Sequence, residues 1–299
     1  MKPAAFRYLR PRTTNEALAM LAEHAGEAKL LAGGQSLVPT MNFRLAQPAV
    51  LVDLNGISEL AYIRPRGDGT SIGAMTRQRA VERSELVASR APLVAETMPW
   101  ISHPQIRNRG TFGGSIAHAD PAAELPAVAV ALGARMRALG VAGERWIAAR
   151  DFFTGLMATA LEPDEILVEV ELPALPPRTG TSFQEAARRH GDYALLGVAA
   201  VVGLDVAGRC REARLVYLSA GETPVVAQGA ARALVGEAPT DEALRVAAEI
   251  AASKDLDPPG DIHASPAFRR HLARGLTVRA LDAAIARARS SNDRKVRET

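Results

Sequence analysis

With 299 residues, the chain is long enough for one large domain or two to three smaller ones, and its 47% hydrophobic and 23% charged residues are ordinary for a globular protein. The net charge of +3 suits an anionic ligand but is too small to indicate a nucleic-acid-binding protein. The single cysteine, Cys210, excludes an intrachain disulfide and any metal cluster held by four cysteines of this chain alone.

Nothing in the sequence indicates export or a membrane span. The N-terminus carries charges throughout and has no apolar run of the signal-peptide type. The longest apolar stretch, 193–204, is too short to cross a bilayer and contains two glycines. We therefore expect a cytoplasmic protein.

The first 57 residues predict a small α/β lobe. Thr13 and Glu16 have the spacing of a capping box, which opens a helix that stops at Gly26. A short buried strand follows, then a helix with apolar residues at helical spacing, then a second buried strand. The predicted ranges are 28–32, 36–45 and 49–54.

From residue 58 the pattern changes to hairpins and helices. The hairpins are predicted at 62–64 with 71–74 and at 136–139 with 145–148, and residues 164–172 alternate as a strand with one wet face. The predicted helices are 76–88, 92–100 and 122–132, with a short helix capped by Asp151.

Prolines at 173, 176 and 177 indicate a domain boundary. Beyond it, three strands and three helices predict a three-stranded antiparallel sheet with helices on one face, an α+β layer. The strands are expected at 182–188, 194–206 and 211–219, and the helices at 226–235, 240–253 and 266–288. The division is therefore a domain of residues 1–176 with lobes 1–57 and 58–176, a domain of residues 177–288, and a basic flexible tail, 289–299.

Two glycine-rich loops stand out. Ala32-Gly33-Gly34-Gln35-Ser36 follows a strand and opens a helix, and Thr111-Phe112-Gly113-Gly114-Ser115 repeats a glycine pair followed by serine. Glycines let the main chain approach an anion closely, and a helix start supplies unpaired N–H donors. Taken alone, such a pair is more often an ordinary turn. Two such loops are able to clamp a diphosphate from both sides, although the sequence has neither the Rossmann G-x-G-x-x-G motif nor a P-loop.

With Asp120-Pro121-Ala122-Ala123-Glu124-Leu125-Pro126 after them, the two loops resemble the FAD-binding medium subunit of the molybdenum hydroxylases, the carbon monoxide dehydrogenase and xanthine dehydrogenase family. The resemblance extends to about Ala286. It implies an α+β fold: a two-lobed FAD-binding domain of the vanillyl-alcohol oxidase and p-cresol methylhydroxylase type, followed by a C-terminal domain of the carbon monoxide dehydrogenase flavoprotein type.

The resemblance also implies a role. A large subunit with a molybdenum cofactor hydroxylates the substrate, and a small subunit with two [2Fe–2S] clusters passes electrons to the FAD of this chain. FAD then reduces NAD, a quinone or another acceptor. The expected assembly is a dimer of heterotrimers. A non-catalytic nucleotide-binding scaffold and a stand-alone flavin oxidase are the alternatives. The sequence alone leaves the substrate open.

The implied cofactor-binding residues include both loops and several positions outside them. Glu124 matches a family position near the adenosine that is usually aspartate, and Leu167 and Gln184 match positions near the flavin. Asp192 and Tyr193 match a stretch that approaches the isoalloxazine; Tyr193 either lies over the ring or is a buried residue at a strand start. Lys29 either adds charge to the site or is a solvated surface lysine. The full set is Lys29, Ala32, Gly33, Gly34, Gln35, Ser36, Thr111, Gly113, Gly114, Ser115, Glu124, Leu167, Gln184, Asp192 and Tyr193.

No residue is expected to act as a catalytic acid, base or metal ligand. His103 and His118 are candidates for a base or for a covalent flavin attachment, and packing or hydrogen bonding is favoured for His118. No cysteine and histidine cluster has metal-ligand spacing. The flavin itself is expected to supply the redox chemistry while the chain binds and orients it.

Overall fold

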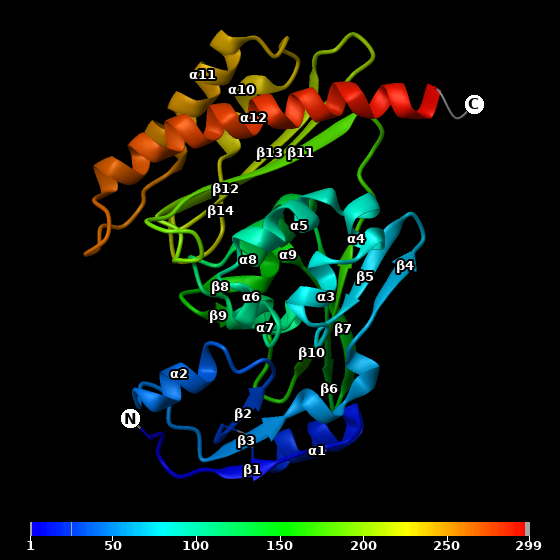
Figure 1. Ribbon diagram of the computed structural model, residues 1–299, viewed down its shortest axis with the longest axis vertical. Coiled ribbons are helices and arrows are strands. Elements are labelled where there is room, and N and C mark those ends of the chain that lie inside the picture. Colours follow the sequence, from blue (N-terminus) through cyan, green and yellow to red (C-terminus); the bar gives the residue numbers. More distant parts are fainter. Residues whose placement is uncertain (1, 25, 297–299) are drawn as a thin grey trace.

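The computed structural model of the chain describes residues 2–24 and 26–296, and only the backbone of 291–296. Figure 1 shows three layers stacked along the long axis: an N-terminal lobe, a central layer and a C-terminal layer crossed by one long helix. The structure combines helices with one parallel sheet and several antiparallel sheets, so the α+β prediction is confirmed.

The N-terminal lobe is a parallel sheet in the order β1-β3-β2. Thr13 caps the first helix, because its Oγ1 accepts from the N–H of Glu16 at 3.2 Å. Strand β1 had no counterpart in the prediction, since three residues carry too little periodicity to be recognised. The elements of the lobe are β1 (Arg7–Leu9), α1 (Thr14–Glu23), β2 (Ala28–Leu31), α2 (Leu37–Asn42) and β3 (Val50–Asp53).

The central layer is an antiparallel sheet in the order β4-β5-β10-β6-β7, which confirms both predicted hairpins and the strand between them. The wet face predicted for that strand is wrong, because all its residues except the half-buried Glu171 are buried. Its inner face packs against helices around Leu93, Val128, Met136 and Val170, all at most 1% exposed. The strands are β4 (Ile63–Arg66), β5 (Gly69–Gly73), β6 (Arg135–Gly140), β7 (Gly143–Ala148) and β10 (Ile166–Leu172). A separate hairpin joins β8 (Phe153–Gly155) to β9 (Ala158–Thr159).

The predicted helix at 76–88 is broken in the structure. Ser84 interrupts it by accepting a hydrogen bond from the N–H of Val87 at 3.3 Å, which makes Ser84 the N-cap of a new helix. The helices of this layer are α3 (Gln78–Glu82), α4 (Glu85–Arg90), α5 (Pro92–Thr97), α6 (Pro104–Arg107), α7 (Phe112–His118), α8 (Glu124–Leu132) and α9 (Ala149–Phe152).

The C-terminal layer is an antiparallel sheet, β11-β12-β13-β14, with helices on one face (Figure 1). Three long strands were predicted, and the structure adds a fourth of two residues. The apolar run noted in the sequence is β12, and it is buried on both faces. Val198 and Val202 pack toward α12, whereas Ala199 and Val201 pack into the central core. The strands are β11 (Thr179–Ala186), β12 (Leu196–Leu204), β13 (Cys210–Leu218) and β14 (Val225–Val226).

The last helix of this layer ends later than predicted. Helix α10 (Gln228–Leu234) and helix α11 (Asp241–Ile250) lie near their predicted ranges, and a π-helical turn, Ala251–Asp255, follows α11. Helix α12 (Pro266–Val296) continues well past residue 288, so most of the predicted flexible tail is helical in its backbone. Residues 297–299 lie outside the described part of the chain.

Candidate functional site

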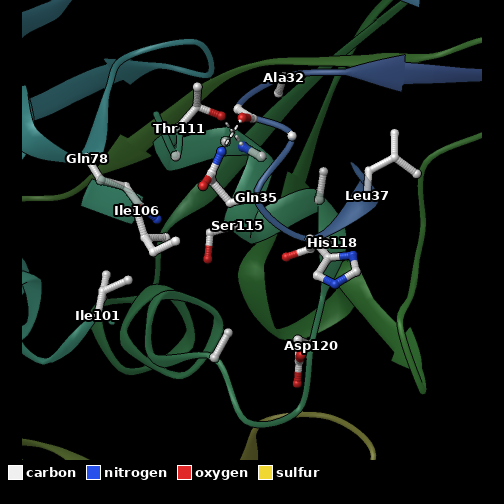
Figure 2. A pocket seen from close by; sticks show the side chains of 18 of the residues that line it. Ala32, Gln35, Leu37, Gln78, Ile101, Ile106, Thr111, Ser115, His118 and Asp120 are labelled. Carbon is white, nitrogen blue, oxygen red and sulfur yellow. Dashed lines mark hydrogen bonds between the residues drawn. The ribbon is translucent and has the colours of Figure 1, made fainter. Parts of the chain in front are cut away.

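A cavity of about 460 Å³ opens between the N-terminal lobe and the central layer, within the range of roughly 300–1,000 Å³ typical of ligand sites. One wall is the first glycine loop, residues 32–36, between β2 and α2. The opposite wall is the second glycine loop, residues 111–115, which runs into α7. Figure 2 shows the side chains of Gln35, Ser115 and His118 around the same space. The two loops predicted from the sequence therefore face each other.

The first glycine loop supplies backbone donors. Within the described part of the chain, the N–H groups of Gly33, Gly34, Gln35 and Ser36 have no hydrogen-bond acceptor. The side chain of Gln35 holds the loop shape, since its Nε2 donates to the carbonyl of Gly33 at 2.9 Å. Four unpaired N–H groups beside a cavity form a binding place for an anionic oxygen, where each charge-assisted bond contributes roughly 1.5–3 kcal/mol.

The second glycine loop differs, because the N–H groups of Phe112, Gly113, Gly114 and Ser115 are already bonded within the chain. Among its described backbone donors, only that of Thr111 has no acceptor. Gly113 donates its N–H to the carbonyl of Ala74 at 2.9 Å, and Ser115 donates its N–H to the carbonyl of Thr111 at 3.2 Å. The N–H of Gly114 is bonded to the Thr111 hydroxyl at 3.1 Å, the N-cap bond of α7. The sequence predicted a clamp with donors on both sides; the structure gives backbone donors on one side and a close-packed wall on the other.

The two loops touch through their backbones. A Cβ on Gly33 would lie 2.5 Å from the carbonyl oxygen of Arg109 and 2.7 Å from Cα of Gly110. A Cβ on Gly114 would lie 3.3 Å from Cβ of Ala32. Close approach between the loops therefore requires glycine at position 33, whereas a Cβ on Gly114 would first meet the hydroxyl of Thr111, in its own loop, at 2.5 Å.

The cavity brings together every predicted site residue except Lys29 and Gln184. Lys29 is exposed on β2, and its neighbour Leu30 lines the cavity, so the alternation of a strand directs the lysine to the other face. Gln184 lies on β11 with its Nε2 donating to the hydroxyl of Ser182 at 3.3 Å. For both residues the structure supplies no contact with the cavity, whereas Asp192 and Tyr193 reach it from the loop between β11 and β12.

Several lining residues were not predicted as part of the site. Gln78 is 4% exposed, and its Oε1 is buried without a hydrogen-bond partner. Others among them are Leu30, Ile101, Ile106, Asp120 and Leu161, together with His118, for which the sequence favours packing or hydrogen bonding. Asp120 lies in the segment 120–126 that carries the family resemblance. No local pattern marks Gln78, because it reaches the cavity only through tertiary packing.

Two buried carboxyl groups, one of which lines the cavity, have raised pKa values. Glu124 lines the cavity at 8% exposure, and burial together with nearby Asp120 raises its pKa to about 7. Glu185 is 9% exposed, its Oε2 has no hydrogen-bond partner, and burial and the charge of Glu124 raise its pKa to about 8. Burial, Asp120 and Glu124 also raise the pKa of Tyr193.

We expect the Glu185→Gln variant to gain stability over the wild type as the pH rises. The folded chain keeps a proton on Glu185 until about pH 8, whereas the unfolded chain loses it near 4.5. The contribution of Glu185 to the free energy of unfolding of the wild type therefore falls as the pH rises through this window. Urea unfolding of the apoprotein should show a difference between variant and wild type that grows by about 3 kcal/mol from pH 6 to pH 9.

The Glu165→Gln variant is the control. The pKa of Glu165 is lowered by its hydrogen bond with Arg145, so this carboxylate is ionised in both states over the same pH range. Its substitution should cost the same stability at pH 6 and pH 9. A constant difference for Glu185→Gln would show that its carboxyl is not held in the neutral form.

Two family models match this chain, one over each part of the fold. A family model described as the FAD binding domain in molybdopterin dehydrogenase matches residues 4–175. A second, described as the CO dehydrogenase flavoprotein C-terminal domain, matches residues 181–284. The chain belongs to the FAD-binding medium subunits of the molybdenum hydroxylases. The medium subunit is thus a flavoprotein component of an oxidoreductase, with FAD as its cofactor.

Similar proteins cover this medium subunit almost completely. The 6-hydroxypseudooxynicotine dehydrogenase complex subunit alpha of Paenarthrobacter nicotinovorans is 41% identical over 98% of this chain and 99% of its own length. The carbon monoxide dehydrogenase structure from Hydrogenophaga pseudoflava has a TM-score of 0.92 at 39% identity, covering 96% of this chain and 99% of that chain. Quinoline 2-oxidoreductase from Pseudomonas putida 86 has a TM-score of 0.91 at 39% identity, with the same coverage. The resemblance and the fold predicted from the sequence are confirmed.

The names of several relatives describe chains or subunits of larger enzymes.

In the described part of the chain, no helix has the length and apolar character needed to cross a membrane. Among the same residues, no cluster of three or more histidine, cysteine, aspartate or glutamate side chains is arranged to hold a metal ion.

Proposed function

We propose that the medium subunit binds one FAD non-covalently in the cavity, with the diphosphate on the first glycine loop. The four N–H groups of Gly33–Ser36 carry this assignment, because they belong to partly buried residues that line the cavity and have no acceptor within the described chain. The second glycine loop limits the cavity from the other side. The proposed contacts are Ala32, Gly33, Gly34, Gln35, Ser36, Thr111, Gly113, Gly114, Ser115, Glu124, Leu167, Asp192 and Tyr193.

The chain's own residues bind and orient, and the flavin when bound supplies the electron chemistry. Tyr193 is 71% exposed although it lines the cavity, so its ring is free to cover an isoalloxazine at the mouth. With its pKa raised to about 7, Glu124 is protonated in a substantial fraction of molecules at neutral pH, and this protonated form is suited to donate a hydrogen bond to an uncharged part of the cofactor. Gln78 offers its buried Oε1 to a donor of the ligand.

In the assembly, this subunit is proposed to take electrons from the [2Fe–2S] clusters of a small subunit and to pass them to NAD, a quinone or another acceptor. A large subunit with the molybdenum cofactor performs the hydroxylation, and the complex forms a dimer of heterotrimers. The single cysteine of the chain supports this division of labour, because cysteine-ligated clusters require four thiolates from elsewhere. The FAD-binding domain is proposed as residues 1–176 and the C-terminal domain as 177–288.

Acid treatment of the purified chain tests the non-covalent assignment. We expect acid precipitation to release yellow flavin into the supernatant at one FAD per chain, since the proposed contacts are hydrogen bonds and packing alone. Flavin retained in the pellet would instead indicate a covalent link, with His118 as the side chain to examine. A colourless protein that takes up no added FAD would favour the nucleotide-binding scaffold.

A further inference from the structure

A chain of side-chain hydrogen bonds joins the two glycine loops through residues that do not line the cavity. Asn55 donates its Nδ2 to the carbonyl of Ala32, in the first glycine loop, at 2.8 Å. Arg77 donates Nη2 to the Oδ1 of Asn55 at 2.6 Å and Nη1 to the carbonyl of Arg109, just before the second glycine loop. Two side chains thus connect carbonyl groups that belong to different lobes.

Both ends of this connection are fixed by further bonds. Asp53 accepts from the backbone N–H of Asn55 at 2.9 Å, and it also accepts from the hydroxyl of Tyr8. On the other side, the backbone of Arg77 forms a β-bridge with Thr111. Flanking bonds at 2.9 Å, from Gln78 N–H to the Gly110 carbonyl and from Phe112 N–H to the Thr76 carbonyl, hold that bridge. The guanidinium therefore reaches across from a segment already bound to the second loop.

Neither Asn55 nor Arg77 lines the cavity, yet their bonds end on two carbonyls beside a close contact between the loops. The contact is that of Gly33 with Arg109 and Gly110, where no Cβ would fit. A guanidinium fixes geometry better than an ammonium, because its planar fork donates to two acceptors at once. The arrangement holds the loops at a set distance before any ligand enters.

We propose that Arg77 and Asn55 are positioning residues that set the spacing of the two glycine loops and so preorganise the FAD site. This inference rests on the proposed function, because it assigns a role in FAD affinity to residues outside the cavity. Preorganisation raises affinity by removing the ordering cost that binding would otherwise carry. Loss of the connection should leave the residues that line the cavity unchanged but let the two glycine loops move relative to each other.

The test compares Arg77→Ala with Arg90→Ala. Arg90 is a matched control, since it also donates to two backbone carbonyls, those of Gly67 at 2.9 Å and Gly69 at 3.1 Å, but in a turn remote from the cavity. Titration of each apoprotein with FAD should give a dissociation constant about 10- to 100-fold higher for Arg77→Ala. Arg90→Ala should bind like the wild type, even if both variants lose the same thermal stability.

Asn55→Ala provides the second variant and completes a double-mutant cycle. Because Arg77 acts through Asn55 on the first loop, the two substitutions together should weaken FAD binding by less than the product of their separate effects. Arg77→Lys should not restore affinity, since an ammonium cannot bridge Asn55 and Arg109 as a planar fork does. Amide hydrogen exchange in the apoprotein should rise at 32–36 in Arg77→Ala but not in Arg90→Ala.

The outcomes separate the two proposals. A wild-type chain that binds no FAD contradicts the proposed function. The positioning role is then judged by amide hydrogen exchange alone, and equal exchange at 32–36 in Arg77→Ala and the wild type overturns it. A wild-type chain that binds FAD, with Arg77→Ala and Asn55→Ala binding equally well, overturns the positioning role alone. Weaker binding in Arg90→Ala to the same extent as in Arg77→Ala also overturns it, because the loss would then follow general destabilisation.

Discussion

Alanine at Gly33 is expected to weaken FAD binding at least 100-fold. Its Cβ would lie 2.5 Å from the Arg109 carbonyl oxygen and 2.7 Å from Cα of Gly110, and both are backbone atoms that cannot rotate away. The loops must therefore separate, and the N–H groups of the first glycine loop lose their alignment on a diphosphate. The loss of two such bonds, at roughly 1.5–3 kcal/mol each, accounts for the expected factor. Fluorescence titration of the apoprotein measures it.

Three other glycines show what causes the effect. Gly208 has a φ of +81° with open space around it, so Gly208→Ala adds backbone strain alone and should leave FAD stoichiometry unchanged. Gly34, with a φ of +73°, would direct a Cβ toward Leu31 and Val38 rather than across the cavity. Gly114→Val should act like Gly33→Ala, since its side chain would enter the space beside Ala32. Full FAD content in soluble Gly33→Ala would show that the loops are ordinary turns.

The purified medium subunit is expected to show no hydroxylase turnover, whereas the assembled enzyme should turn over. The chain has one cysteine, and hydroxylation in the proposed complex depends on cofactors of the other two subunits. Oxygen-isotope incorporation into a family substrate should fall below detection for the single chain after metals are excluded by elemental analysis. Addition of the large and small subunits should restore it.

Partial reactions supply the control for that measurement. The same single chain, once loaded with FAD and reduced chemically, should still reduce an artificial acceptor, because the flavin needs no partner for that step. Hydroxylation by the metal-free single chain would contradict the subunit assignment and favour the stand-alone oxidase. Failure of the reduced flavin to transfer electrons would indicate a cofactor bound in an unreactive position.

The position of the site could be predicted from the sequence because its signals are local. A glycine pair before a helix start, repeated once, is visible without any tertiary information, and both copies line the cavity. The use of the donors was not predictable in the same way. The N–H of Gly113 is taken by Ala74, which is far away in the sequence, so only the structure shows that the second glycine loop is a wall.

Residues that arrive by packing escaped the sequence analysis. Gln78 reaches the cavity through the bridge of its segment with the second glycine loop, and Glu185 becomes buried beside Glu124 only when the C-terminal layer covers the central one. Lys29 shows the opposite error, because adjacency to the first loop in sequence does not place a strand residue on the same face.

The C-terminal layer shows the same limits at the level of secondary structure. The three long strands have clear apolar patterns, and all three are present. Strand β14, only Val225–Val226, pairs with β13 but is too short for any periodic signal. The extension of α12 to Val296 passes through polar residues that resemble a frayed end, because composition alone does not locate the last turn of a helix.

A crystal structure of the wild-type chain with FAD tests the central claim most directly. The account predicts the diphosphate between the two glycine loops, with its oxygens within hydrogen-bond distance of the N–H groups of Gly33–Ser36, and the isoalloxazine extending toward Tyr193. Density for FAD at another place on the molecule, or a diphosphate that faces the second loop while the first-loop N–H groups remain unpaired, would contradict it.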